Sequence, residues 1–403
     1  MPAFLLAGGG VAIEIPLSLL VVFASAKLLA ECCERLGQPG IIGEIAAGIL
    51  IGPHVLGWMA PNDLLRVLSA LGVMFLLFHV GLEVKSSELM QVGGTAMLVA
   101  VAGVVLPFLA GWAIGLAWGE AEIEAVFVGA AMVATSVGIT ARVLASRGLL
   151  QARASRIILA AAVIDDVLGL IVLATVSSMA RGAVAWLNLA LTALAAIGFT
   201  ALVAHFGTRT MTRVIPRVQE RLNLAEGQFA LAMTLLFGLA LLAVYAGVAA
   251  IIGAFLAGMA LSQSVDRRVH EMTSGVTELL VPFFLAGIGL HFDLSAFATF
   301  RTLSLALAIL AAAMVTKVAG CGLGALKLGR ADAVRVGVGM IPRGEVGMVV
   351  AQIGLSMQVI SPGTYGVVVF MSVATTLIAP PLLKWAYRGL PAASGAEEVA
   401  RLG

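Results

Sequence analysis

Apolar segments of about 20 residues, the length that spans the hydrocarbon of a bilayer, follow one another along almost the whole chain. The predicted spans are residues 15–31, 41–59, 65–84, 95–118, 124–146, 157–181, 187–206, 228–247, 249–264, 274–292, 302–326, 333–356 and 364–388. Because 61% of the 403 residues are hydrophobic and only 11% are charged, the chain cannot cover itself with polar surface as a water-soluble domain does. The sequence therefore predicts an all-α polytopic membrane protein with about thirteen transmembrane helices.

Basic residues are unequally divided between alternate connections of this map. The odd-numbered connections and the C-terminal tail hold 18 of the 24 lysines and arginines, whereas the even-numbered connections hold only Arg66, Arg181 and Arg301. Positive charge favours the cytoplasmic side, so we expect an outside N-terminus and a cytoplasmic C-terminus in the inner (plasma) membrane. The first 26 residues contain no lysine or arginine, which argues against a cleaved signal peptide.

Two pairs of matching segments indicate an internal repeat. "IIGEIAAGILIG" (41–52) matches "IIGAFLAGMALS" (251–262) at five of twelve positions, with an offset of 210. "FLLFHVGLEV" (75–84) matches "FFLAGIGLHF" (283–292) at four of ten positions, with an offset of 208. Each copy would contain five helices, and an odd number makes the copies enter the membrane from opposite sides. Such inverted repeats are typical of secondary transporters.

The fourth helix of each predicted repeat is interrupted. The repeats run over residues 41–181 and 249–388, and their fourth helices contain "TSVGIT" (135–140) and "GMIPRGEVG" (339–347). Glycine, hydroxyl and β-branched residues interrupt the first helix, and Pro342 with three glycines interrupts the second. Broken helices expose carbonyl oxygens to which a cation can bind. An ordinary glycine packing kink is the alternative for either segment alone.

Asp165 and Asp166 lie side by side in the otherwise apolar segment 157–181. A charge in hydrocarbon costs roughly 2.5–3.5 kcal/mol, so these carboxyls must line water, meet a cation or be protonated. The candidate partner is Lys317, which lies too deep in its own helix to reach the membrane surface easily. A buried Asp–Lys pair can exchange protons. The alternatives are a fixed salt bridge that only holds the helices together, and a permanently neutral acid pair.

Other charged residues lie in or at the ends of the apolar segments. We expect Arg343 and Glu345, on the second broken helix, to contribute the electrostatics of the core by neutralising each other. Glu44 and Glu83 are expected to line a funnel or an interface. The three cysteines and five histidines show no metal-binding spacing, and we expect no resident metal or cofactor, no enzyme activity and no nucleic-acid partner.

A set of motifs spread over residues 15–388 resembles the monovalent cation:proton antiporters of the NapA and Kef branch. The motifs are "QPGIIGEIAAGILIGPHVLG" (38–57), "LFHVGLE" (77–83), "TSVGITARVL" (135–144), "DD" (165–166), "TK" (316–317) and "PRGEVG" (342–347). The resemblance implies an NhaA-like antiporter fold with crossed discontinuous helices, and a homodimer in the lipid bilayer.

The resemblance also implies a core ion-transport domain and a dimerisation or panel domain. The expected division is residues 1–84 and 225–293 for the panel domain, 92–181 and 299–388 for the core domain, 187–222 for a linker helix, and 389–403 for a short cytoplasmic tail. Kef members carry a C-terminal nucleotide-binding domain, whereas this chain ends about fifteen residues after its last predicted helix. We therefore expect no gating by such a domain.

Residue by residue, the resemblance assigns roles in ion binding and proton binding. Asp166 matches the main sodium ligand and proton carrier, and Asp165 matches the acid that pairs with the lysine, here Lys317. Thr135 and Ser136 lie at the unwound crossing, so the expected ion ligands are Asp166, Asp165 and Thr135. In this family an Asp-Asp pair with a lysine suggests electrogenic exchange.

The predicted function is proton-driven export of a monovalent cation by alternating access, with Na⁺ and H⁺ competing for one carboxylate site. Alternatives with the same fold are a K⁺/H⁺ antiporter of the Kef type without its regulatory domain and a Na⁺-coupled organic-anion symporter. A cation channel is disfavoured by the inverted repeat. An intramembrane aspartyl protease is also disfavoured. Its two aspartates must face each other across one proton from separate helices, whereas Asp165 and Asp166 are neighbours on one predicted helix. Sodium, lithium and potassium all suit oxygen ligands, so the sequence leaves the cation open.

Overall fold

The computed structural model describes residues 11–36, 38–84, 92–180, 186–219, 226–292 and 299–388. Within these ranges the chain is helical, with one short 3-10 turn, η3 (Leu326–Leu328), and no strand. The helices are α1 (Val11–Arg35), α2 (Gly40–Ile51), α3 (Asp63–Glu83), α5 (Gly93–Ala117), α6 (Glu122–Val133), α7 (Val137–Ala145), α8 (Arg153–Ala180), α9 (Trp186–Gln219), α10 (Gly227–Tyr245), α11 (Ala250–Leu261), α12 (Arg267–Leu290), α13 (Phe300–Gly324), α14 (Arg330–Gly339), α15 (Glu345–Ser356) and α16 (Pro362–Ala386). The predicted all-α class is confirmed.

Nine helical stretches in the described ranges are long and apolar enough to cross a bilayer. They are α1, α3, α5, α8, α10, α12, α13, α16 and the stretch Glu122–Ala145, which α6 and α7 form together. Large apolar side chains such as Leu28 of α1 (66% exposed) and Val315 of α13 (64% exposed) cover their outer faces. Such a surface suits lipid rather than water, so the chain is a multi-pass membrane protein. The larger number of thirteen crossings stays a prediction.

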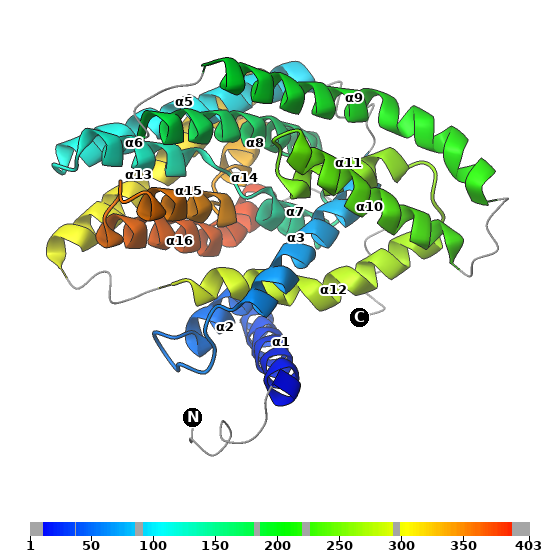
Figure 1. Ribbon diagram of the computed structural model, residues 1–403, viewed down its shortest axis with the longest axis horizontal. Helices are drawn as coiled ribbons and strands as arrows, with labels where there is room; N and C mark the ends of the chain where they lie inside the picture. Colours follow the sequence, from blue (N-terminus) through cyan, green and yellow to red (C-terminus); the bar gives the residue numbers. More distant parts are fainter. Residues whose placement is uncertain are drawn as a thin grey trace.

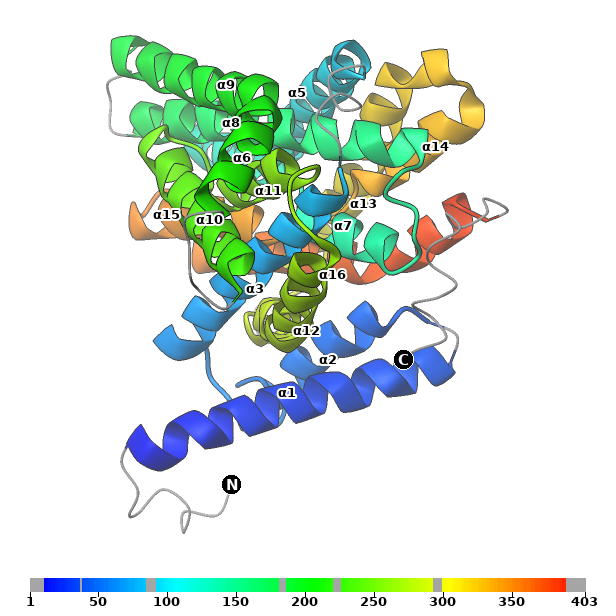
Figure 2. The same cartoon turned by 90° about the vertical axis from the view of Figure 1, so that its right-hand side faces the viewer.

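The helices pack in two sets, which Figures 1 and 2 show from two sides. The panel set consists of α1–α3 and α10–α12, in which α3 packs against α11 and α12, α1 against α2, and α10 against α11. The core set consists of α5–α8 and α13–α16, in which α5 packs against α6, α8 and α13, and α13 against α14 and α16. The long helix α9 packs against α11 of one set and α8 of the other. It lies along the top of Figure 1.

Glycines bring pairs of helix backbones together in the panel set, and these meeting points follow the sequence repeat. A Cβ atom at Gly48 of α2 would overlap the carbonyl oxygen of Ala286 on α12, and one at Gly258 of α11 would overlap that of Phe78 on α3. Gly258 follows Gly48 by 210 residues and Ala286 follows Phe78 by 208, the offsets of the two sequence matches. The repeat thus relates α2 to α11 and α3 to α12, so the α2–α12 contact corresponds to the α11–α3 contact. A two-fold axis that relates two copies of one repeat produces this exchange of partners.

The correspondence begins one helix earlier than the predicted five-helix repeats. Gly43 of α2 packs against the backbone of Leu29 on α1, and Gly253 of α11 packs against the backbone of Leu239 on α10. Both members of the second contact follow those of the first by 210 residues. Helices α1 and α10 are therefore matching first helices of the two halves.

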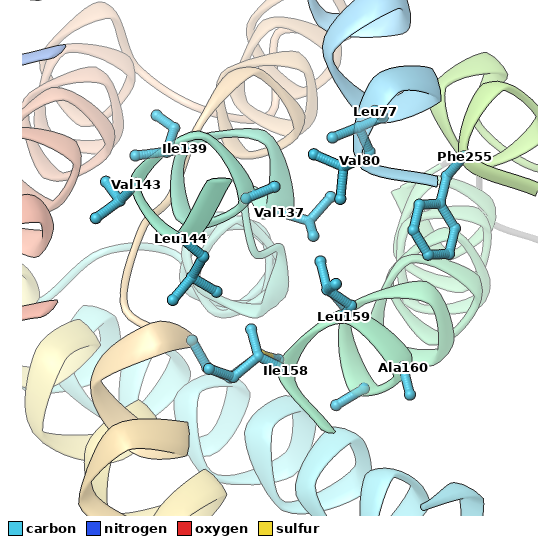
Figure 3. Packing of buried hydrophobic residues seen from close by; sticks show 14 of the residues in the cluster. Leu77, Val80, Val137, Ile139, Val143, Leu144, Ile158, Leu159, Ala160 and Phe255 are labelled. Carbon is cyan, nitrogen blue, oxygen red and sulfur yellow. The ribbon is translucent and has the colours of Figure 1, made fainter. Parts of the chain in front are cut away.

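An apolar seam joins the panel set to the core set. Figure 3 shows Leu77 and Val80 of α3, Phe255 of α11, Val137 of α7 and Leu159 of α8 pointing toward a shared cluster, in which all five are buried. Apolar contact depends on buried area rather than on direction. Such a seam tolerates displacement of one helix set against the other better than a network of hydrogen bonds would.

Candidate functional site

The acid pair lies inside the core set, on α8. Asp165 is fully buried and Asp166 is 8% exposed. Lys317 of α13 is also fully buried, and its Nζ lies 3.1 Å from Oδ2 and 3.2 Å from Oδ1 of Asp165. The structure thus brings Asp165 and Lys317 into contact, and their role in transport stays a prediction. An ion pair out of water persists only where charge and hydrogen bonds compensate the lost hydration.

Small residues of α5 and α13 make room for the lysine. A Cβ atom at Gly103 of α5 would come 3.2 Å from Nζ of Lys317 and 2.7 Å from Sγ of Cys321. The Cys321 thiol, one helical turn beyond Lys317, donates to the carbonyl of Val99 over 3.6 Å. A glycine on α5 thus lets the ammonium group reach Asp165 without passing a side chain.

Both predicted helix interruptions are present. Residues 134–136 separate α6 from α7, and Ala134 has an extended ψ of 136°. Residues 340–344 separate α14 from α15. Pro342 has no N–H to donate and disfavours helical dihedral angles at the residue before it, which accounts for the second break.

The two breaks lie against each other. The Ser136 N–H donates to the Pro342 carbonyl over 2.8 Å. The Thr140 hydroxyl donates to the Gly339 carbonyl over 2.7 Å. Because Gly339 ends α14, its carbonyl has no partner within its own helix. The two interrupted helices therefore satisfy part of each other's free backbone.

Arg343 connects the second break to the first. Its side chain is fully buried, and it donates from Nη1 to the Ala134 carbonyl (3.1 Å) and from Nη2 to the Ala313 carbonyl (3.4 Å). The guanidinium is also close enough to Asp165 for the two charges to interact. The side chain of Glu345 lies outside the described part of the structure, so its neutralisation of Arg343 stays a prediction.

Buried hydroxyl groups of the first break lie beside these groups. Thr135 is 3% exposed, Ser136 is 2% exposed, and both are in the first break. The Thr135 hydroxyl makes no hydrogen bond to any described residue. A buried hydroxyl without a partner costs free energy unless a ligand or water satisfies it. Thr135 and Asp166 are therefore the groups here that fit a small cation with oxygen ligands.

Three threonines at the breaks have no counterpart among the predicted site residues. They are Thr140 and the neighbours Thr375 and Thr376 on α16, all fully buried. The sequence repeat could have pointed to the α16 pair, because Thr375 and Thr376 follow Asp165 and Asp166 by 210 residues. No signal in the local sequence distinguishes Thr140 from an ordinary helix residue.

A pocket of about 520 Å³ lies between the panel set and the core set. Helices α1, α2 and α12 line one side, and α7 and α16 line the other. Ion pairs line it: Lys27 with Glu44 (3.0 Å), Lys27 with Glu278 (3.5 Å) and Arg142 with Glu278 (2.6 Å). The last pair joins α7 to α12, so one of these contacts must change whenever the two sets move apart.

Three comparisons with known proteins cover most of the chain. Residues 19–389 match the family described as "Sodium/hydrogen exchanger, transmembrane". The Na⁺/H⁺-K⁺ antiporter GerN of Bacillus cereus is 34% identical over 91% of this chain and 95% of its own length. The high-affinity Na⁺/H⁺ antiporter NhaS3 of Synechocystis is 34% identical over 93% of this chain and 90% of its own length.

A solved structure has the same fold. The sodium proton antiporter MjNhaP1 from Methanocaldococcus jannaschii superposes with a TM-score of 0.72 over 94% of this chain and 97% of that chain, at 17% sequence identity.

Proposed function

The chain belongs to the sodium/hydrogen exchanger family, whose members are membrane ion transporters, and it is a Na⁺/H⁺ antiporter; on this premise we propose that Asp165, Asp166 and Lys317 perform the exchange. The observation that carries the proposal is a fully buried Asp165–Lys317 pair, next to a second buried acid, in the same helix set as two broken helices that meet.

Competition at Asp166 couples the two ions. An ionised carboxylate only accepts hydrogen bonds. A neighbouring oxygen therefore repels it unless a cation or a proton lies between the two oxygens. Thr135, with its unused hydroxyl, would be a further ligand of the sodium ion. When the carboxyl is protonated, it can donate to the same oxygens and the sodium ion is no longer held. One site therefore holds either sodium or a proton, and each displaces the other.

The Asp165–Lys317 pair would make the exchange electrogenic. If sodium binding draws Asp165 toward the ion, Lys317 loses its counter-charge and can release its own proton. More than one proton then crosses for each sodium ion, and the net charge moved is worth about 2.3 kcal/mol per 100 mV. If the pair instead stays a fixed salt bridge throughout the cycle, the exchange is electroneutral.

Alternating access would come from the core set moving against the panel set. The pocket between the sets supports this division, which follows the predicted core and panel domains, with α9 as the linker helix. Arg142, Arg147 and Lys384 line it, and their charge supports a cytoplasmic opening in the plasma membrane, with the N-terminus outside.

The panel set would also form a homodimer. The exposed apolar side chains of α1 and α10, such as Leu20 (65% exposed) and Tyr245 (80% exposed), support this part of the proposal. Cross-linking in native membranes tests it, and a purely monomeric population would refute it.

Transport in proteoliposomes loaded with a pH-sensitive dye tests the site. We expect Asp166→Asn to abolish sodium-dependent proton movement, because asparagine cannot carry the charge that both ions need. Asp266→Asn, at the exposed start of α12, is the matched control and should exchange normally. Full activity of the Asp166 variant would refute the assignment.

The same assay identifies the cation and the charge movement. Sodium, lithium and potassium chloride are added in turn, and potassium is a serious candidate because the relative GerN is described as a Na⁺/H⁺-K⁺ antiporter. Reversal measured at several imposed membrane potentials then decides electrogenicity: an electroneutral exchanger would reverse at the same ion gradients whatever the potential.

A further inference from the structure

Two neighbouring threonines on α16 hold the break between α14 and α15. The Arg343 N–H donates to the Thr375 hydroxyl oxygen over 3.1 Å, and the Thr376 hydroxyl donates to the Arg343 carbonyl over 2.7 Å. One residue of the break thus has both of its backbone groups satisfied by side chains of another helix. In a membrane interior each such group must find a partner, because water does not reach it.

The hydrogen bonds of the two hydroxyls are complementary. The Thr375 hydroxyl gives its own proton to its helix, with acceptors at Met371 (2.8 Å) and Ser372 (3.1 Å), so its oxygen is left to accept from Arg343. The Thr376 hydroxyl gives its proton to the Arg343 carbonyl instead. Neither valine nor alanine at these positions could reproduce this division of donor and acceptor.

The backbone that the threonines hold carries a guanidinium of the site. With the main chain of Arg343 fixed on both sides, its side chain reaches the carbonyls of Ala134 and Ala313 and interacts with Asp165. A change at Thr376 would therefore reach the acid pair through Arg343 and not by direct contact. The same change would reach the first break, because Ala134 is part of it.

The threonine pair on α16 can be compared with the acid pair on α8. Thr375 and Thr376 follow Asp165 and Asp166 by 210 residues, and the two pairs lie on α16 and α8, the last helices of the two halves. In one half the pair is acidic, and in the other it is neutral and hydrogen-bonded to the Arg343 backbone. A hydroxyl can both donate and accept without charge, whereas an ionised carboxylate only accepts.

We propose that Thr375 and Thr376 are positioning residues of the ion site, which fix the Arg343 guanidinium beside Asp165 by holding its backbone in the break. This inference rests on the proposed role of the acid pair.

The test compares Thr376→Val with Thr376→Ser in proteoliposomes, with apparent KM for sodium and the pH profile as readouts. Valine keeps the size of threonine but removes the hydroxyl, and an unsatisfied buried carbonyl is costly, so we expect KM to rise about tenfold and the pH profile to move. Serine keeps the hydroxyl and should restore both. Thr234→Val is the matched control, because among the described residues that hydroxyl donates within its own helix, to the Ala230 carbonyl over 2.8 Å.

The outcomes separate this inference from the proposed function. If the wild-type protein exchanges, Asp166→Asn is inactive and Thr376→Val matches the wild type in KM and pH profile, the positioning role is wrong and the acid site stands. If Thr376→Val does not fold, Thr376→Cys replaces it, because cysteine is a weak donor of about the size of serine. A cysteine variant that behaves like the serine variant would overturn the inference.

Discussion

The fully buried Asp165–Lys317 pair makes a quantitative prediction about stability. Both side chains have no exposed surface, and Nζ lies within 3.2 Å of both carboxylate oxygens. Removing one partner of such a pair costs about 3–5 kcal/mol, because the other charge stays buried without compensation. Lys317→Met and Asp165→Asn, which nearly keep the side-chain volumes, should each lower the free energy of unfolding by about this amount.

The structure also predicts which single variant is worse. Asp165 interacts with two buried cations, Lys317 and Arg343. Asp165→Asn leaves both of them together without a counter-charge, whereas Lys317→Met leaves Asp165 with Arg343. We therefore expect the asparagine variant near the upper end of the range and the methionine variant near the lower end, at about 5 and about 3 kcal/mol.

The double variant completes the cycle. It removes both charges at once, and replacing a whole buried pair by neutral groups is often close to neutral for stability. The double variant should therefore be more stable than either single variant, with a coupling energy of a few kcal/mol. Thermal unfolding of the four proteins in one detergent, followed by tryptophan fluorescence, measures the order of stabilities.

Two results would refute this reasoning. The first is a pair of single variants as stable as the wild-type protein, which would mean that the charges are hydrated. The second is a double variant no more stable than the worse single variant, which would mean that packing and not charge is lost. In the transport assay, Lys317→Met should keep some exchange but lose its dependence on membrane potential.

Three further predictions follow from other contacts. Thr135→Val should raise the apparent KM for sodium without loss of melting temperature, because the hydroxyl has no partner among the described residues; an unchanged KM would remove it from the ligands. Gly48→Ala should prevent recovery of a monodisperse protein in size-exclusion chromatography, because its Cβ would overlap the α12 backbone, whereas Gly238→Ala, which meets open space, should be tolerated. In a cysteine-free background, a short bis-maleimide joining Arg142→Cys to Glu278→Cys should stop exchange, since these side chains connect the two sets; exchange at the normal rate after complete cross-linking would refute the relative movement.

Several features of the site are predictable from residue types alone. Carboxyls and a lysine inside apolar segments are costly enough to demand an explanation, so Asp165, Asp166 and Lys317 stand out in the sequence itself. Proline and clustered glycines located the break at residues 340–344. The family, too, was predictable from the motifs and is confirmed, whereas its NapA and Kef branch stays a prediction.

The contacts of the backbone were not predictable in this way. Arg343 binds the carbonyls of Ala134 and Ala313, and every residue has a carbonyl, so no residue type indicates which one a guanidinium reaches. Thr375 and Thr376 are ordinary residues for a helix. Their importance comes from the Arg343 backbone that faces them.

By itself, the sequence determined that the chain lies in a membrane, that its two halves repeat and that a few charges are buried, because hydropathy and the cost of burying charge act locally along the chain. Only the tertiary structure decided which buried groups meet: that Lys317 reaches Asp165 past Gly103, that the two breaks bond to each other, and that a pocket opens between the two helix sets. These contacts join residues separated by up to some 250 positions, as between Lys27 and Glu278. Such contacts depend on how whole helices pack, which no local pattern encodes.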